Sequence, residues 1–396
     1  MNRLKIFFVL VLIAQLLIMC RNNNKAAGRH GISENVNYRI IGYVAGYRDF
    51  DFSAIDASKL THINYAFSNV IDGKVMFDTS GIDETSLSSD DLITLGRLRQ
   101  KNPDLKILVS VGGWTWSGNF SDAALTEDSR SRFAVSAAGF VERYNLDGID
   151  IDWEYPNQTG AGNIYRAEDR ENFTLLLRAV RERLDEMADE QGRSEGYLLT
   201  IATGADIEYI FNTDLGKAHK YLDFINIMTY DFHNGLHTQT GHHANLQHSS
   251  ADDPGGSNIL QSVQLHLDAG VPASKLNMGI PFYGRMWEDV YPEKRGLYQE
   301  AATTGQIIFY RTIAEEMLAN EGFVRYWDVS AAAPYLWNEK DSIFVSYEDE
   351  ESIRQKMDWL RRKGLGGVMF WEYTDDPSGR LLDAVWHYLR ETELVY

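Results

Sequence analysis

The feature that most constrains the fold is a regular alternation of short apolar runs with longer amphipathic segments. Short runs rich in β-branched and aromatic residues are predicted to be strands at 40–46, 61–67, 106–111, 148–152, 197–203, 224–229, 275–281 and 366–371. Helices are predicted between or after them at 88–101, 122–144, 168–190, 258–269 and 379–390. Strands separated by helices pair in parallel, and about eight such repeats predict a (β/α)8 barrel, the TIM-barrel fold.

One interval is too long for a single helix. Residues 286–343 separate the last two predicted strands and contain a helix candidate at 312–321 and two strand-like stretches, FVRYWD and SIFVSY. Structureless loops of this length are rare in compact domains. We therefore predict an α+β subdomain inserted between strands 7 and 8, with the barrel formed by 38–285 and 344–396.

The first 20 residues form a hydrophobic leader. Arg3 and Lys5 precede an apolar run that ends at Cys20, the only cysteine of the chain. The pattern is typical of a secretory signal and is short for a membrane-spanning helix. The run LIMC is similar to the processing site of bacterial lipoproteins, with Met19 where a small residue is usual. We expect an exported protein, secreted or held on the cell envelope by lipid on Cys20, with 21–37 as a polar tether. An ordinary leader cut slightly downstream is the alternative.

The charge balance narrows the choice of partners. The formal net charge is −19, which argues against nucleic acid or an anionic membrane surface as a partner. A neutral substrate is compatible with it. We expect a monomer whose only membrane contact is the lipid anchor.

The stretch DGIDIDWEYP places four acids close together among large apolar residues. Because side chains alternate along a strand, Asp150, Asp152 and Glu154 share one face, with Glu154 at the C-terminal end where barrel enzymes carry their chemistry. Asp147 has the opposite parity and is interpreted as structural. Burial and mutual repulsion raise the pKa of stacked carboxyls, so one acid can stay protonated near neutral pH and donate a proton.

Two other uses of such a row stay open on these grounds. It can be a buried polar network without a catalytic role, or it can bind a hard cation such as Ca²⁺ or Mg²⁺. The interleaved Ile149, Ile151 and Trp153 do not resemble a flexible cation-binding loop.

The same stretch resembles the signature D-x-x-D-x-D-x-E of the family 18 glycoside hydrolases, the chitinase family. Similar segments cover most of the chain: SVGGW at 110–114, MTYDFHNGLHTQTGHHANL from Met228, GIPFYGR ending at Arg285 and GGVMFWEY around Trp371. The insertion is similar to the α+β domain that many of these chitinases carry. The resemblance implies a chitinase that hydrolyses β-1,4-linked N-acetylglucosamine polymers or oligomers, without a cofactor or a metal ion.

The resemblance also implies a retaining mechanism in which the substrate supplies the nucleophile. Glu154 would protonate the glycosidic oxygen, and the acetamido oxygen of the sugar would attack its own anomeric carbon. Asp152 would orient the acetamide, Asp150 would hold or relay charge beneath it, and Tyr230 would hydrogen-bond the acetamide carbonyl.

A set of substrate-binding residues follows from the same resemblance. Trp371 would form the floor under the reacting sugar, Asp231 would contact that sugar, and Met228 would line the wall. Tyr43 and Ser110 are expected to hydrogen-bond Asp150. The further candidates are Phe67, Gly113, Tyr283 and Arg285, with Trp114, Trp116 and Trp287 as flanking sugar platforms. For the tryptophans and Met228 core packing is the alternative, and for Asp231 it is a helix N-cap.

Histidines crowd one loop, at His233, His237, His242, His243 and His248. Their spacing matches no zinc motif closely. The loop resembles the family segment named above, so we expect no metal site.

Two other functions remain as alternatives. An endo-β-N-acetylglucosaminidase acting on N-glycans or cell-wall glycans shares the acid motif and mechanism, but such relatives often lack the insertion. A sugar-binding lectin on an inactive scaffold usually lacks the acid, whereas Glu154 is present.

Overall fold

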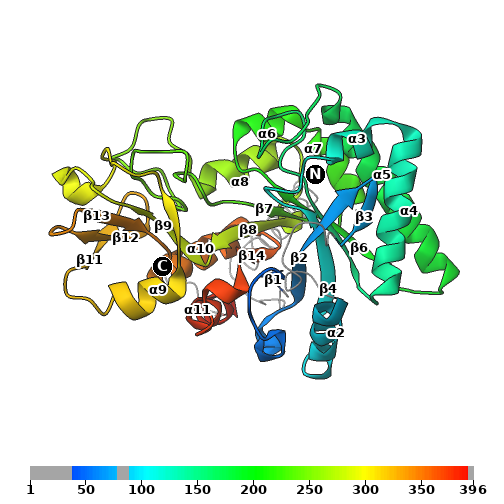
Figure 1. Cartoon of the computed structure of the whole chain (residues 1–396), viewed down its shortest axis with the longest axis horizontal. Helices are drawn as coiled ribbons and strands as arrows, with labels where there is room; N and C mark the ends of the chain where they lie inside the picture. Colours follow the sequence, from blue (N-terminus) through cyan, green and yellow to red (C-terminus); the bar gives the residue numbers. More distant parts are fainter. Residues whose placement is uncertain (1–37, 78–88, 391–396) are drawn as a thin grey trace, which may run out of the picture. The chain divides into compact units, whose positions relative to one another are not determined.

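The barrel is closed by eight parallel strands (Figure 1). The computed structural model describes residues 38–77 and 89–390, so the predicted leader, Cys20 and the tether at 21–37 lie outside the described residues. The barrel strands are β1 (Arg39–Ala45), β2 (His62–Ile71), β4 (Lys106–Gly112), β5 (Gly148–Asp152), β6 (Leu198–Thr203), β7 (Phe224–Ile227), β8 (Leu276–Pro281) and β14 (Gly367–Trp371). β1 pairs with both β14 and β2, which closes the ring. The predicted (β/α)8 fold is confirmed, and a short strand β3 (Lys74–Met76) adds antiparallel to β2.

Helices alternate with these strands as predicted. They are α2 (Ser89–Arg97), α3 (Phe120–Leu125), α4 (Glu127–Arg143), α5 (Asp169–Glu190), α6 (Ile207–Asn212), α7 (Leu215–Ala218), α8 (Ile259–Asp268), α10 (Glu350–Lys363) and α11 (Arg380–Arg390). The single helix predicted at 122–144 is wrong. Thr126 is extended there, and its side chain forms a capping box with Ser129 that ends α3 and starts α4. No helix within 38–77 or 89–390 combines the length and apolarity needed to cross a membrane.

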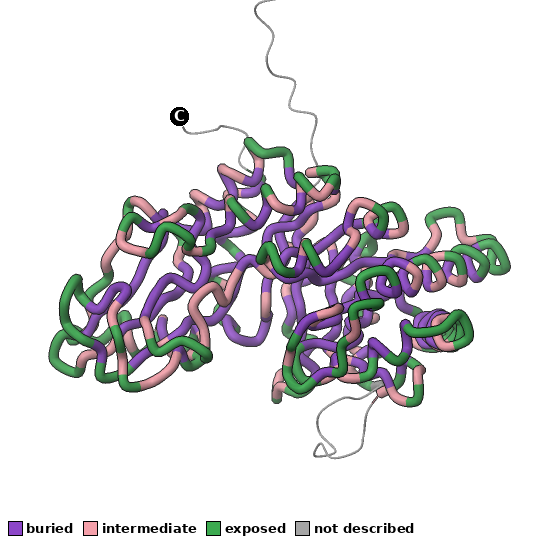
Figure 2. The backbone as a smooth tube through the Cα atoms, turned by 90° about the horizontal axis from the view of Figure 1, so that it is seen from above, coloured by how far each residue is buried: buried purple, intermediate pink, exposed green. Residues whose placement is uncertain are grey.

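The two faces of each barrel strand have different surroundings. Ile149, Ile151 and Trp153 point outward into the main core, where the Trp153 ring stacks on Phe120 at 5.4 Å between centroids. Figure 2 shows buried positions along the inner strands and exposed positions on the outer helices and loops. The acidic side chains therefore occupy the inward face of β5, as the alternation of side chains along a strand predicts.

A second sheet is inserted between β8 and β14, which confirms the predicted α+β insertion (yellow to orange in Figure 1). Its strands are antiparallel, in the order β10 (Gln306–Phe309), β9 (Tyr283–Trp287), β13 (Ile343–Ser346), β12 (Ala333–Asn338) and β11 (Val324–Asp328). The sheet takes in residues on both sides of the predicted limits 286–343, because β9 starts directly after β8.

The junction between the barrel and the second sheet is short and well packed. Phe282 alone separates Pro281, at the end of β8, from Tyr283, at the start of β9. Its ring stacks on Phe370 of β14 at 4.1 Å between centroids, and its N–H donates to the carbonyl of Trp371 at 2.7 Å.

The helix predicted at 312–321 is much shorter. Residues Tyr310–Thr312 form α9, and one π-helical turn, Ile313–Met317, follows. Beyond Met317, the side chain of Asn320 accepts a hydrogen bond from the N–H of Gly322, so the end of the predicted range is a turn and not a helix.

Candidate active site

The three acids of the β5 motif are buried in the barrel interior and at its C-terminal end. Asp150 and Asp152 are inward residues of β5, and Glu154 follows the strand. The loop after β4 holds Glu154, because Ser117 Oγ accepts its N–H at 2.8 Å. The same hydroxyl donates to the carbonyl of Gly113 at 2.9 Å. The hydrogen bond from the Glu154 N–H to Ser117 therefore fixes the position of Glu154.

Asp150 is the anchored member of the row. It accepts hydrogen bonds from Tyr43 Oη at 2.7 Å, Ser110 Oγ at 2.8 Å and Thr200 Oγ1 at 2.5 Å. The first two are the bonds expected from the sequence, and Thr200 was missed. Burial raises the pKa of Asp150, and these hydroxyls together with Asn226 oppose the rise.

The surroundings of Asp152 and Glu154 favour the protonated forms of both side chains. Burial, then the charges of Glu154 and Asp150, raise the pKa of Asp152 well above its usual value. Burial raises the pKa of Glu154 to about 7; the Tyr155 hydroxyl lowers it and the charge of Asp231 adds to the rise. Within the described residues, Oδ1 of Asp152 has no hydrogen-bond partner, so this buried oxygen can accept a bond from a ligand.

Aromatic side chains stand at the end of the barrel beside the acids. Trp371 stacks on Phe67 with ring centroids 5.4 Å apart and planes 17° apart, and Tyr43 lies 5.7 Å from it. Gly113 is at φ 81°, and a Cβ there would lie 2.7 Å from the Phe67 ring. Gly113 is therefore needed for the position of Phe67.

Met228 and Tyr230 border the same cluster of inward residues as Trp371. The Tyr230 hydroxyl lies 3.9 Å from Sδ of Met369, and its ring is 6.2 Å from that of Tyr283. Both Met228 and Tyr230 are partly exposed, so they can meet a ligand above the row of acids.

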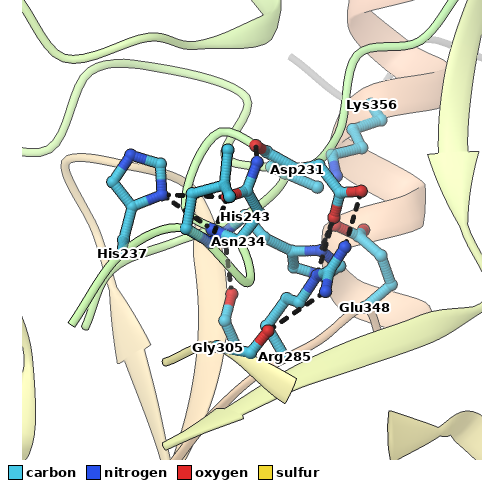
Figure 3. A network of polar contacts seen from close by, with 11 residues as sticks. Asp231, Asn234, His237, His243, Arg285, Gly305, Glu348 and Lys356 are labelled. Carbon is cyan, nitrogen blue, oxygen red and sulfur yellow. Dashed lines mark hydrogen bonds and ion pairs between the residues drawn. The ribbon is translucent and has the colours of Figure 1, made fainter. Parts of the chain in front are cut away.

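Asp231 is an ion-pair residue, not a helix cap. Arg285 contacts it at two points, with Nε 2.8 Å from Oδ1 and Nη2 2.7 Å from Oδ2 (Figure 3). Arg285 also donates to the carbonyl of Gly305 at 3.0 Å. Burial works against ionisation of Asp231, but His243 and Arg285 prevail and hold its pKa at about 2. Asp231 has φ 61°, and no helix begins there.

His243 lies beside this pair; from the sequence it is named only among the five histidines of the loop, and its contact with Asp231 is not predicted there. Its Nδ1 lies 3.8 Å from Oδ1 of Asp231, and burial lowers its pKa to about 4. The only signal was its place in the TGHH segment. A buried ion pair between Lys356 and Glu348 lies close by (Figure 3).

The tryptophan candidates differ in exposure. Trp114 is 48% exposed and meets Tyr155 edge to face at 6.4 Å, and Trp116 is partly exposed. Trp287 is 0% exposed, in the core of the second sheet, and donates to the carbonyl of His237. The interpretation of Trp287 as a sugar platform is therefore wrong.

The histidines of the loop have separate partners. His242 contacts Asp328 at 3.3 Å, and His248 bonds the carbonyl of Asp253 at 2.7 Å. In the part of the chain that the structure describes, no three His, Cys, Asp or Glu side chains gather in a way that could hold a metal ion.

Asp147 has the structural surroundings expected from its parity. It contacts Arg99 at 2.5 Å and Arg193 at 2.9 Å, and it accepts the N–H of Ile107 at 2.9 Å. Burial raises its pKa, but these partners lower it overall.

Comparisons with known proteins agree with this arrangement. The family model described as "Glycosyl hydrolases family 18" matches residues 39–376. Chitinase A1 of Niallia circulans is 38% identical over 87% of this chain, which spans 57% of that relative. Chitinase B of Serratia marcescens is 29% identical, over 85% of this chain and 77% of its own length. A family 18 N-acetylglucosaminidase from Paenibacillus barengoltzii is 44% identical, with a TM-score of 0.81 over 89% of this chain and 100% of its own. The chain therefore belongs to family 18 of the glycosyl hydrolases.

Proposed function

We propose that this protein is a chitinase that hydrolyses β-1,4-linked N-acetylglucosamine polymers or oligomers with retention of anomeric configuration. The observation that carries the proposal is the row of buried carboxyls, anchored below at Asp150 and ending above in Glu154, whose pKa is raised to about 7. The relatives named chitinases support the substrate class.

Glu154 is the general acid and then the general base. With a pKa of about 7 it is protonated in a large part of the molecules near neutral pH, which is the condition for efficient proton transfer in both directions. It donates its proton to the glycosidic oxygen as the bond breaks. It then takes a proton from the water that completes hydrolysis.

The substrate's acetamido oxygen is the nucleophile in this proposal. It closes on the anomeric carbon to give an oxazolinium ion, which water then opens with retention. Asp152 accepts a hydrogen bond from the acetamide N–H through its free oxygen, and Tyr230 donates to the acetamide carbonyl. Asp150 remains beneath as the fixed charge. These steps use only side chains, substrate and water, and no cofactor takes part.

The surrounding residues shape the site for the sugar. Trp371, supported by Phe67, is the floor under the reacting ring, and Met228 lines the wall. Asp231 and Arg285 hydrogen-bond sugar hydroxyls, with Tyr283 beside them. The exposed Trp114 is a platform for a neighbouring sugar.

A second candidate is an N-acetylglucosaminidase that releases single sugars from chain ends. It is favoured by the relative of that name, which is 44% identical and is covered over its whole length. An endo-β-N-acetylglucosaminidase on N-glycans or cell-wall glycans shares the chemistry. The lectin alternative is disfavoured because Glu154 is present with a pKa suited to proton transfer.

Digestion of a labelled panel of chitooligosaccharides, colloidal chitin and N-glycans separates these candidates. A chitinase is expected to give mainly disaccharides and longer products, and the second candidate mainly monosaccharide. Cleavage of the N-glycans alone would overturn the choice of chitin. Binding without turnover of any member would favour the lectin.

Chitin binding, export and the lipid anchor on Cys20 belong to the same proposal. Export and the lipid anchor rest on the sequence of the leader and tether, and chitin binding rests on the site and on the relatives named chitinases. A monomeric state is proposed as well and is checked by sedimentation analysis of the mature protein.

A further inference from the structure

A continuous line of polar side chains runs through the barrel below Asp150. Nε of Arg39 donates to Oδ1 of Asn277 at 2.9 Å, and Nδ2 of Asn277 donates to Oδ1 of Asn226 at 3.0 Å. Nδ2 of Asn226 donates to Oη of Tyr43 at 3.3 Å, and that hydroxyl donates to Oδ2 of Asp150 at 2.7 Å. We call Arg39, Asn277, Asn226 and Tyr43 the polar file.

Every hydrogen bond of the polar file donates in the same direction, from the cation toward the carboxylate. The ends fix this direction, because a guanidinium has only donors and an ionised carboxylate only accepts. The middle is fixed independently: Nδ2 of Asn277 also donates to the carbonyl of Ile225 at 3.3 Å. Reversing this amide would set its oxygen against that carbonyl and its nitrogen against Arg39.

The strand registers place the polar file. Asn226 of β7 is the register partner of Asn277 of β8. Arg39 and Asn277 flank Gly367 of β14 from its two sides. A Cβ at Gly366 would collide with Nη2 of Arg39, so the glycines that open β14 leave room for the arginine to cross that strand.

The polar file lies where its electrostatic effect is strong. Tyr43, Asn226 and Asn277 are buried, and aligned hydrogen bonds polarise one another in surroundings of low dielectric constant. Burial lowers the pKa of Arg39 to about 10, so the guanidinium is still charged at neutral pH.

Few other charged or polar groups lie close to Asp150 and Arg39, the two residues that the polar file joins. The groups facing Asp150 from the other elements are Ser110 on β4, Thr200 on β6 and Tyr230 after β7, and Asp152 faces it from the same strand, β5. The groups facing Arg39 are Asp223 before β7 and His62 on β2. Burial lowers the pKa of His62 to about 3, so it is neutral.

We propose that Arg39, Asn277 and Asn226 are positioning residues that keep Asp150 ionised through a one-way file of hydrogen bonds from the opposite end of the barrel. The catalytic consequence rests on the proposed function: with the charge fixed on Asp150, the proton of the Asp150–Asp152 pair resides on Asp152, next to the substrate. Loss of the polar file lets Asp150 take up a proton at higher pH.

The direct test is a pH titration of the full chain labelled with ¹³C at the aspartate carboxyls, with the Asp150 signal assigned from Asp150→Asn. In Arg39→Met, the titration midpoint of Asp150 is expected to rise by about half a pH unit to one unit. Arg39→Lys restores a charged donor and is expected to shift it less. Asn277→Leu adds no charge and leaves Arg39 charged, but its side chain cannot donate to Asn226, so it is expected to shift the midpoint as Arg39→Met does, even if the latter folds poorly.

Arg99→Met is the matched control. Arg99 lies at the same end of the barrel and contacts Asp147 at 2.5 Å, but it has no link to the polar file. It is expected to leave the Asp150 midpoint in place. An equal shift in this control would mean that net charge acts through space and would overturn the role of the polar file. Unchanged Asp150 midpoints in folded Arg39→Met and Asn277→Leu would overturn that role as well.

Activity gives a second readout. The acid limb of the kcat/KM profile on a chromogenic chitobioside is expected to move to higher pH by the same amount in Arg39→Met and Asn277→Leu, with KM near the wild-type value. Should the wild type prove inactive on every chitin substrate, the proposed function fails, while the titration still decides whether the polar file holds Asp150 ionised.

Discussion

Arg285 and Asp231 join the second sheet to the barrel by a two-point contact. Arg285 lies on β9, and Asp231 follows β7. The two carboxylate oxygens lie 2.8 and 2.7 Å from Nε and Nη2. A planar guanidinium makes such a contact and an ammonium does not. The arginine at position 285 therefore forms the ion pair and also holds the subdomain in a fixed position.

Arg285→Lys is therefore expected to destabilise the protein. The folded pKa of Asp231 is about 2, below its usual 3.8, so its stabilising effect is present above pH 3.8 and is lost as pH falls toward 2. At pH 7 the variant is expected to lose about 2 kcal/mol of unfolding free energy. Urea unfolding at pH 7 and pH 3 measures this, and the difference should shrink at pH 3. Arg325→Lys, in a more exposed pair with Asp349, is the control and should change little.

Glu154→Gln is expected to abolish turnover while leaving oligosaccharide binding nearly intact. Glutamine keeps the shape but cannot deliver a proton, and general acid catalysis contributes about 10²–10⁴-fold. The proposed stacking on Trp371 and the proposed acetamide contacts of Asp152 and Tyr230 are unchanged in this variant. Hydrolysis of a chromogenic chitobioside and calorimetric binding of a chitooligosaccharide form the paired measurement. Asp152→Asn, which impairs the acetamide's attack, is the comparison. Near wild-type turnover by Glu154→Gln would remove Glu154 from the role of acid.

The activity is expected to fall as pH rises through about 7. Glu154 must carry a proton to act as acid, and its pKa is raised to about 7. The basic limb of the kcat/KM profile measures this value. A basic limb two units higher would show that another group is the acid.

The same shift has an effect on stability. The folded pKa of Glu154 lies above its usual 4.5, so its stabilising contribution is complete below pH 4.5 and is lost as pH rises through about 7. Glu154→Gln is therefore expected to melt at a higher temperature than the wild type at pH 8 and at a similar temperature at pH 4. Differential scanning calorimetry at both values provides the comparison.

The first product is expected to be the β-anomer. In the proposed mechanism the nucleophile comes from the substrate on the face opposite the leaving group, and water then restores the configuration. Proton NMR of fresh hydrolysate decides, and α-anomer at early times would contradict the mechanism. A thiazoline that mimics the oxazolinium ion should inhibit, and EDTA should leave the activity unchanged.

Cys20→Ala is expected to release the protein from membranes or to block processing of the leader. The reason is the position of the sole cysteine at the end of the hydrophobic run. Fractionation of cells and mass spectrometry of the mature N-terminus give the readout. An unmodified N-terminus beyond Cys20 in the wild type would end the lipid-anchor proposal.

The barrel could be predicted from the sequence because its signal is local. The strand at 148–152 is found at the predicted residues, since alternation within one strand fixes both its bounds and its inward face. β12 was missed: its sequence APYLWN contains a proline and lacks a polar face, because all of its residues are buried. The helix predicted at 312–321 was overestimated at its C-terminal end, where Asn320 forms a turn.

The parts of the site that could not be predicted depend on pairing between strands. Thr200 reaches Asp150 because the two are register partners on β5 and β6. Asn226 and Asn277 meet through the register of β7 and β8. A linear sequence does not state these registers. The motif residues Asp150, Asp152 and Glu154 were found because they lie within one strand and its end.

The single residue between β8 and β9 limits how the protein can meet its substrate. Phe282 stacks on the ring of Phe370 and donates its N–H to the carbonyl of Trp371. Because both contacts hold it in place, this connection is not expected to act as a hinge. The second sheet is thus expected to stand still while a saccharide arrives, rather than closing over it as a lid. The sugar chain then bears most of the ordering cost of binding, and stiffer oligosaccharides should bind with the smaller entropic loss.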